Sequence, residues 1–377
     1  MPSAATPPVW DFPFQRPALP APQAWLRFLE VPYARHWFSN NGSLAMALEA
    51  RLAARCDRPI ALACNGTAAI TAALMSLDQP GAVLLPSFTF PATLSAVQQA
   101  GRTPVLADVD ARSWELSVDT VEAAVRRSPV PIAAVLGVRT FGLCRDWTEV
   151  QAWCDARGVP LILDSAAALG GRLADGRLVG VQGLMETFSL HATKVFAVGE
   201  GGAIACDPDR LPALRRVMNF GLDAGELVGD GFNGKVSEFT AAIGLAQDVV
   251  FDAQLAARRA AAARYAGFWQ SRAPAWSIPW APGDPPWQAY PVVAPSADAA
   301  DRFEARAAAR GLQIRRYYRP ALHTAPSQAR HAYGLALPVS GDLSARMVCL
   351  PMYSDLFESE HGDLLSRVQD ALQAARS

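Results

Sequence analysis

Short apolar runs alternate with amphipathic segments over the first half of the chain. The runs are nearly free of polar positions, which is typical of strands that are buried on both faces. Regular alternation of such strands with helical segments indicates a mostly parallel sheet covered by helices. We expect seven strands, at residues 60–64, 82–86, 103–108, 133–137, 160–164, 187–190 and 202–206.

The segments between these runs, and most of the chain after them, have helical periodicity. A stretch rich in Ala, Leu, Arg and Phe predicts helical structure over 236–270, and the Pro- and Trp-rich segment 273–287 then indicates a domain edge. We expect helices beginning near 43, 66, 91, 118 and 146, further helices at 298–310 and 359–376, and short strands at 290–294, 312–318 and 347–351.

These elements predict an α/β protein with a mixed, mostly parallel seven-stranded sheet sandwiched by helices, and a smaller C-terminal α+β domain. We divide the chain into an N-terminal arm over 1–40, a large domain over 41–250 and a small domain over 251–377. The first 22 residues are rich in proline and predict an irregular start to the arm.

Composition narrows the classes of function. The 377 residues are 51% hydrophobic and 18% charged, with a formal net charge of −1 and no basic block. Nucleic-acid binding and docking on anionic membranes therefore lack electrostatic support. We also expect no membrane span, no signal peptide and no metal site. The six cysteines lack the C-x-x-C spacing and indicate free thiols in a reducing cytoplasm.

Candidate binding residues follow two of the predicted strands. Open α/β sheets bind ligands where loops leave the carboxyl ends of strands. After 60–64, the backbone NH groups of Gly66 and Thr67 open a helix and can cradle a phosphate; an ordinary capped turn is the alternative. Asp164 ends another apolar strand. A buried carboxylate there can pair with a protonated ring nitrogen, and a helix N-cap is the alternative.

A lysine follows the strand at 187–190. Lys194 lies five residues after Ser189 and before the glycine-rich stretch 199–202. Burial lowers the pKa of a lysine amine, which makes it a nucleophile and a proton carrier; a lysine that extends from a loop to solvent is the alternative. Phosphate turn, aspartate and Ser-x-x-x-x-Lys, in this order, together predict a site for pyridoxal 5'-phosphate (PLP).

Longer blocks of the sequence resemble the DegT/DnrJ/EryC1/StrS aminotransferases, and the likeness covers nearly the whole chain. The blocks are NGTAA, PSFTFPATLSAVQQAGRTPVLADVD, LDSAAALG, FSLHATKVFAVGEGGAI and GFNGKVSEFTAAIGLAQ. The resemblance implies a fold-type-I PLP-dependent enzyme that transfers an amino group from glutamate to a nucleotide-linked keto sugar. It also implies a homodimer whose chains share each active site.

The resemblance implies roles for individual residues. Lys194 would hold the cofactor covalently and move the proton, Asp164 would hold the pyridinium, and the ring of Phe90 would stack on the cofactor face. Asn233 would reach the phosphate of the cofactor in the neighbouring chain. Gly66, Thr67 and Ser189 would bind the phosphate of the chain's own cofactor.

Two positions bear on the type of reaction. Ala167 stands where many family members have a Gln or His that contacts the cofactor, so one contact is missing. Lys194 is present, whereas relatives that dehydrate the sugar have a histidine there, which favours transamination. The block from His191 to Lys194, followed by Gly-Glu-Gly-Gly, resembles the branch that acts at C4 of 4-keto-6-deoxyhexoses.

The substrate implied by that branch is dTDP-4-keto-6-deoxyglucose, converted to dTDP-4-amino-4,6-dideoxyglucose. A transaminase of a non-nucleotide ketone, such as a cyclitol, is one alternative. A catalytically silent regulator on the same fold is another, although the intact set of Lys194, Asp164 and Ser189 argues against it.

Further residues are open to two interpretations. His191 can contact the cofactor or substrate, or make a structural hydrogen bond. The residues from Arg315 to Tyr318, with His323, can face the sugar diphosphate, or hold the small domain together. Alternation along a strand would turn only some of them inward.

Overall fold

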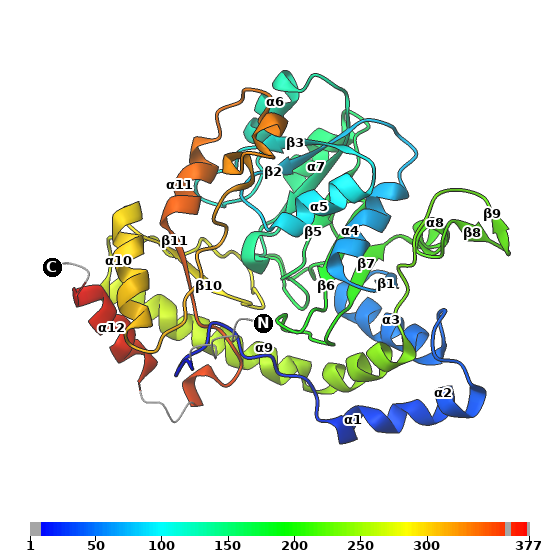
Figure 1. The fold of residues 1–377 in the computed structure, drawn as a ribbon, viewed down its shortest axis with the longest axis horizontal. Coiled ribbons are helices and arrows are strands. Elements are labelled where there is room, and N and C mark those ends of the chain that lie inside the picture. The colour runs from blue at the N-terminus through cyan, green and yellow to red at the C-terminus, as the bar shows by residue number, and fades with distance from the viewer. Residues whose placement is uncertain (1–8, 359–362, 375–377) are drawn as a thin grey trace, which may run out of the picture.

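A seven-stranded sheet forms the centre of the larger part of the computed structural model, which describes residues 9–358 and 363–374 (Figure 1). Its strand order is β1-β7-β6-β5-β4-β2-β3. Strand β7 pairs antiparallel with both neighbours, and the other pairs are parallel. The predicted mixed, mostly parallel sheet is therefore confirmed. The strands are β1 (Ile60–Ala63), β2 (Ala82–Pro86), β3 (Thr103–Ala107), β4 (Ile132–Val138), β5 (Leu161–Asp164), β6 (Met185–Ser189) and β7 (Gly202–Cys206).

Helices cover both faces of this sheet, because alternate residues of each strand point to opposite faces. In β2, Val83 and Leu85 pack in one core, and Ala82 and Leu84 pack in the other. The first face carries α4 (Gly66–Met75), α5 (Pro91–Gln99) and α8 (Leu211–Val217). The second face carries α3 (Ser43–Cys56), α6 (Val118–Arg127) and α7 (Thr148–Asp155).

One long helix, α9 (Glu238–Arg272), connects the sheet to the C-terminal part of the chain (Figure 1). Phe251 and Leu255 pack in the core beneath α3, whereas Tyr265 and Trp269 belong to the core of the C-terminal part. The predicted division between residues 250 and 251 falls inside this helix, and the division of the chain into domains stays a prediction.

The C-terminal part contains an antiparallel pair of strands, β10 (Tyr290–Val293) and β11 (Met347–Leu350). The strand expected at 312–318 was wrong. Leu312 and Arg315 form only single bridges, to Phe12 and Cys349, and a turn begins at residue 317, so no ladder develops. The helices of this part are α10 (Ala297–Ala308), α11 (Pro338–Arg346) and α12 (Leu364–Ala374).

The described part of the N-terminal arm, residues 9–40, packs against the rest of the chain. Phe12 and Phe14 are buried, and two short helices follow, α1 (Pro22–Leu26) and α2 (Glu30–Arg35). At the end of the molecule opposite α10 and α12, β8 (Leu222–Asp223) and β9 (Glu226–Leu227) form a projecting hairpin (Figure 1). Within residues 9–358 and 363–374, no helix is both long and apolar enough to cross a bilayer.

A buried ion pair supports the strand end that carries Asp164. Arg139 Nε donates to Glu186 Oε1 at 2.8 Å, and both side chains have no exposed surface. Ser165 Oγ also donates to Glu186 Oε1, at 3.0 Å, and the Arg139 backbone NH donates to the Asp164 carbonyl oxygen, at 3.0 Å. The pair therefore braces the chain on both sides of the candidate carboxylate.

Replacing Glu186 with leucine would leave the Arg139 charge buried without this partner. We expect the free energy of unfolding to fall by about 3–5 kcal/mol, measured by urea denaturation followed by circular dichroism. The double variant Arg139→Met/Glu186→Leu removes both charges and should recover most of the loss. A single variant as stable as the wild type would contradict this account.

Candidate active site

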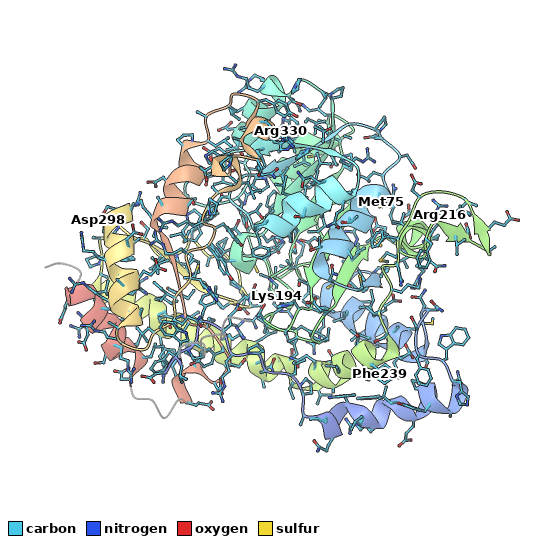
Figure 2. All side chains as sticks on the ribbon, viewed as in Figure 1. Met75, Lys194, Arg216, Phe239, Asp298 and Arg330 are labelled. Carbon is cyan, nitrogen blue, oxygen red and sulfur yellow. The ribbon has the colours of Figure 1, made fainter. Side chains whose placement is uncertain are left out.

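The predicted site residues meet at one cavity of about 1160 Å³. It lies at the carboxyl ends of β5 and β6, and its wall extends to the N-terminal arm and to the C-terminal part of the chain. Lys194 lies near the middle of the molecule (Figure 2). Six of the predicted residues line the cavity: Gly66, Thr67, Phe90, Asp164, Ser189 and Lys194.

Asp164 ends β5 with its side chain buried, at 5% exposure. Thr93 Oγ1 donates to Asp164 Oδ2 at 2.7 Å, and the Ala166 backbone NH donates to Oδ1 at 3.1 Å. Burial raises the pKa of the Asp164 carboxyl, while these two hydrogen bonds and the charge of Lys194 oppose the rise. No helix begins between β5 and β6, so the N-cap alternative is wrong.

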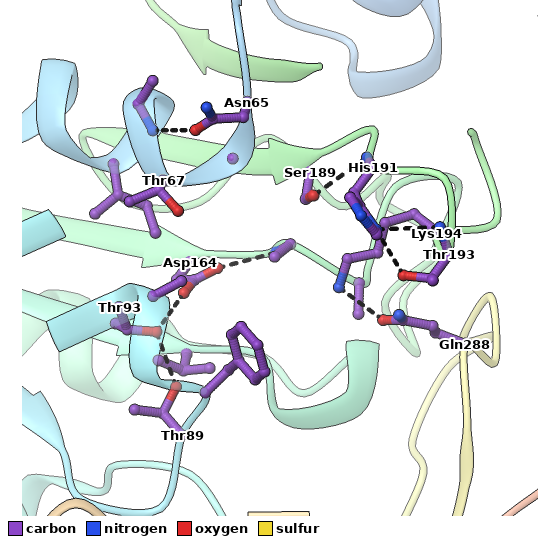
Figure 3. Close-up of a pocket in the computed structure, with 18 of the residues that line it drawn as sticks. Asn65, Thr67, Thr89, Thr93, Asp164, Ser189, His191, Thr193, Lys194 and Gln288 are labelled. Atoms are coloured by element: carbon purple, nitrogen blue, oxygen red, sulfur yellow. Dashed lines mark hydrogen bonds between the residues drawn. The ribbon is translucent and has the colours of Figure 1, made fainter. Parts of the chain in front are cut away.

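Lys194 follows β6 in a turn closed by its backbone NH, which donates to the His191 carbonyl oxygen at 2.8 Å. Its side chain points into the cavity, where Nζ donates to Gln288 Oε1 at 2.9 Å (Figure 3). Burial lowers the pKa of the Lys194 ammonium group to about 8, and the negative charge of Asp164 opposes this fall. The alternative of a lysine that extends to solvent is therefore wrong.

The start of α4 forms a cradle for an anion. Asn65 caps the helix by accepting from the Ala68 backbone NH at 2.8 Å, and the NH groups of Gly66 and Thr67 have no acceptor in the described part of the chain. A Cβ at residue 66 would lie 2.8 Å from the Ser189 Cβ, so glycine is needed for the helix to approach β6. Free NH groups at a helix start are a general binding site for phosphate.

These residues fit PLP in the chemistry of their donors and acceptors. The helix start and the Ser189 hydroxyl can receive its phosphate, the Asp164 carboxylate its ring nitrogen, and the Lys194 amine its aldehyde. Lys194 and Asp164 point towards the same space, from the ends of neighbouring strands (Figure 3).

Other candidates separate into those that line the cavity and those that do not. Arg315, Tyr317 and Tyr318 line it. Arg316 instead donates to the Met347 carbonyl oxygen at 2.9 Å, and His323 Nδ1 lies 2.7 Å from Ser87 Oγ. The expected alternation therefore holds from Arg315 to Tyr317 and ends at Tyr318, which lines the cavity next to Tyr317 because a turn begins there.

The structural hydrogen bond of His191 is present, since its Nδ1 lies 2.9 Å from Thr193 Oγ1. His191 also lines the cavity, and its contact with the cofactor or substrate stays a prediction. Ala167 also lines the cavity. Asn233 is exposed and does not line the cavity of its own chain, although the two residues before it, Gly231 and Phe232, do. Its role towards a neighbouring chain stays a prediction.

Sequence reasoning missed several residues of the site. Thr93 and Thr89 form a pair of hydroxyl groups, 2.9 Å apart, that leads to Asp164. Their position next to Phe90, after the second predicted strand, is the signal that could have found them. Gln288 and Gln15 lie beside proline-rich segments that the pattern marked as irregular, and nothing in the sequence marked their contacts.

The fold and the site together define a PLP-dependent transferase of fold type I. The sequence profile of the DegT/DnrJ/EryC1/StrS aminotransferase family matches residues 29–369, and the chain belongs to this family. It is therefore a PLP-dependent aminotransferase, as the sequence predicted.

Two relatives and one solved structure illustrate the similarity. Protein Rv3402c of Mycobacterium tuberculosis is 33% identical, over 95% of this chain and 90% of that protein. The dTDP-4-amino-4,6-dideoxy-D-glucose transaminase of Escherichia coli is 27% identical, over 92% of this chain and 95% of that protein. The crystal structure of DesI in the presence of its TDP-sugar product is 31% identical, with a TM-score of 0.84 over 100% of this chain and 95% of that one.

Replacing Gly66 with alanine should weaken PLP binding, because the new Cβ pushes the start of α4 away from Ser189. We expect the dissociation constant, measured by titrating PLP-free protein and following absorbance, to rise by about tenfold or more. Gly267→Ala is the matched control, since a Cβ at residue 267 meets nothing within 4 Å. Equal affinity of both variants for PLP would refute phosphate binding at the start of α4.

The reactivity of Lys194 should follow a pKa of about 8 in PLP-free protein. Competitive acetylation at varied pH, read by peptide mass spectrometry, should show its reactivity rising as pH increases through about 8, because only the neutral amine reacts. Asp164→Asn removes an opposing negative charge and should shift the midpoint to lower pH. Lys235, the other lysine of the chain, is the internal control. A midpoint near that of an ordinary lysine would contradict the burial argument.

Proposed function

We propose that the chain transfers an amino group from glutamate to a nucleotide-linked 4-keto-6-deoxy sugar. The preferred substrate is dTDP-4-keto-6-deoxyglucose, and the product is dTDP-4-amino-4,6-dideoxyglucose. The enzyme would work as a cytoplasmic homodimer in which Asn233 of each chain completes the site of the other. The observation that carries the proposal is the single cavity shared by Lys194, Asp164 and the start of α4.

The size of the cavity supports a large substrate. Pockets for small ligands usually measure about 300–1,000 Å³, and this one measures about 1160 Å³. Space therefore extends beyond the cofactor residues, along the N-terminal arm and the C-terminal part of the chain. The E. coli relative, which is named for a dTDP-linked 4-amino sugar, supports the nucleotide and the C4 position. The structure of DesI in the presence of its TDP-sugar product supports the nucleotide.

When bound, PLP supplies the electron sink for breaking a carbon–hydrogen bond. Lys194 takes the proton from the substrate carbon and returns it, since its lowered pKa leaves part of the amine neutral near pH 8. Gln288 Oε1 accepts from Nζ and orients the amine. Asp164 stabilises positive charge at the ring nitrogen, and Thr93 holds the carboxylate in place. 2-Oxoglutarate would leave first, and the amino group, carried by the bound cofactor, would then pass to the keto sugar.

The test uses PLP-loaded enzyme, ¹⁵N-labelled glutamate and separate ketones: dTDP-, GDP- and UDP-linked 4-keto-6-deoxy sugars, and a cyclitol ketone. Mass spectrometry should detect ¹⁵N in the dTDP sugar and 2-oxoglutarate in equal amount. Lys194→Ala should abolish the product, and Lys235→Ala should retain it.

Labelling of the cyclitol alone would overturn the nucleotide-sugar proposal and would favour a transaminase of a non-nucleotide ketone. Absence of 2-oxoglutarate with every ketone would favour the silent regulator.

A further inference from the structure

An extended segment of the C-terminal part places every second side chain in the cavity. Backbone bridges from Leu312 to Phe12 and from Arg315 to Cys349 hold the segment between the arm and β11. In an extended chain, alternate residues point to opposite sides. Leu312 and Ile314 are buried in the apolar core, and Arg316 is turned away. Tyr318, where a turn has begun, also lines the cavity. Within the extended segment, the side chains that line it are those of Gln313, Arg315 and Tyr317.

These three side chains present hydrogen-bond donors. Gln313 Oε1 accepts from the Phe14 backbone NH at 2.9 Å, which leaves its NH₂ group to donate. The Arg315 guanidinium has donors only. Burial raises the pKa of the Tyr317 hydroxyl, although the charge of Arg315 opposes the rise, so the hydroxyl stays protonated and can donate. Gln15, from the arm, lines the same cavity.

The other cations of the cavity are already engaged. Lys194 is assigned to the cofactor, and the Arg139 guanidinium is bound to Glu186, to Gln182 Oε1 and to the Arg145 carbonyl oxygen. Arg315, by contrast, is exposed and makes no ion pair with any described residue. A row of donors around an unpaired guanidinium is suited to oxygen anions.

We propose that Gln313, Arg315 and Tyr317, with Gln15, form a subsite for the anionic oxygens of a substrate. The phosphate of the cofactor is accounted for at α4, so the anion is a phosphate of the sugar nucleotide or a carboxylate of the amino donor. The inference rests on the proposed function, which supplies these two sources of the anion. It assigns anion binding to Arg315 and not to Arg316 or Arg319, which pair with Asp301 and do not line the cavity.

Calorimetric titration of the PLP-loaded enzyme with dTDP, and separately with 2-oxoglutarate, tests the subsite. Arg315→Gln should weaken the binding of at least one probe by about tenfold or more. Gln313→Glu retains an acceptor for the Phe14 NH but replaces the donor with a charged oxygen, so it should weaken the same probe. Arg319→Gln is the matched control, because Arg319 lies in the same segment, pairs with Asp301 and does not line the cavity.

The two probes separate the sources of the anion. A loss confined to dTDP assigns the subsite to phosphate, and a loss confined to 2-oxoglutarate assigns it to a carboxylate. Unchanged affinity for both probes in Arg315→Gln and Gln313→Glu would overturn the subsite, even if the wild type converts the keto sugar. Loss of probe affinity in these variants, together with a wild type that converts no keto sugar, would overturn the proposed function alone.

Discussion

Two ionisable groups held in one cavity, away from bulk water, are the constraint on which the site depends. The parallel strands β5 and β6 are neighbours, so Asp164 at the end of one and the turn after the other lie at the same edge of the sheet. Burial disfavours both charges, lowering the pKa of Lys194 to about 8 and raising that of Asp164. Each charge partly stabilises the other. The result is an amine that is neutral often enough to react.

Keeping these groups in place requires contacts from distant parts of the chain. Thr93, at the start of α5, holds the carboxylate, and Gln288, beside β10, holds the amine. Below them, the buried pair of Arg139 and Glu186 braces the end of β5. The N-terminal arm and the extended segment from Gln313 to Tyr317 also line this cavity, so the proposed substrate recognition would depend on parts that belong to no strand of the sheet.

Most strands of the sheet, and the site residues that lie directly after them, can be predicted from local sequence. Strands buried on both faces give continuous apolar runs, and β2 and β7 begin and end where the pattern predicted. Asp164, Ser189 and Lys194 were found because chemistry at strand ends is adjacent in sequence to the strands themselves. The helix at Gly66 was found for the same reason.

The remaining features depend on tertiary contacts that no local pattern contains. The bond from Thr93 to Asp164 spans 71 residues, and that from Lys194 to Gln288 spans 94. The segment 312–318 begins with the alternating apolar and polar residues of a strand, but its partners are single residues of the arm and of β11, so no ladder forms. The proposed role of Asn233 involves a second chain, and one sequence cannot supply the geometry between two chains.

Reduction of the PLP-loaded enzyme with borohydride, followed by peptide mass spectrometry, tests the central claim most directly. Lys194 and Lys235 are the two lysines of the chain, so the site of attachment can be read without ambiguity. The account predicts a reduced cofactor adduct on Lys194 and none on Lys235. An adduct on Lys235, or an enzyme that binds PLP without any covalent attachment, would contradict it.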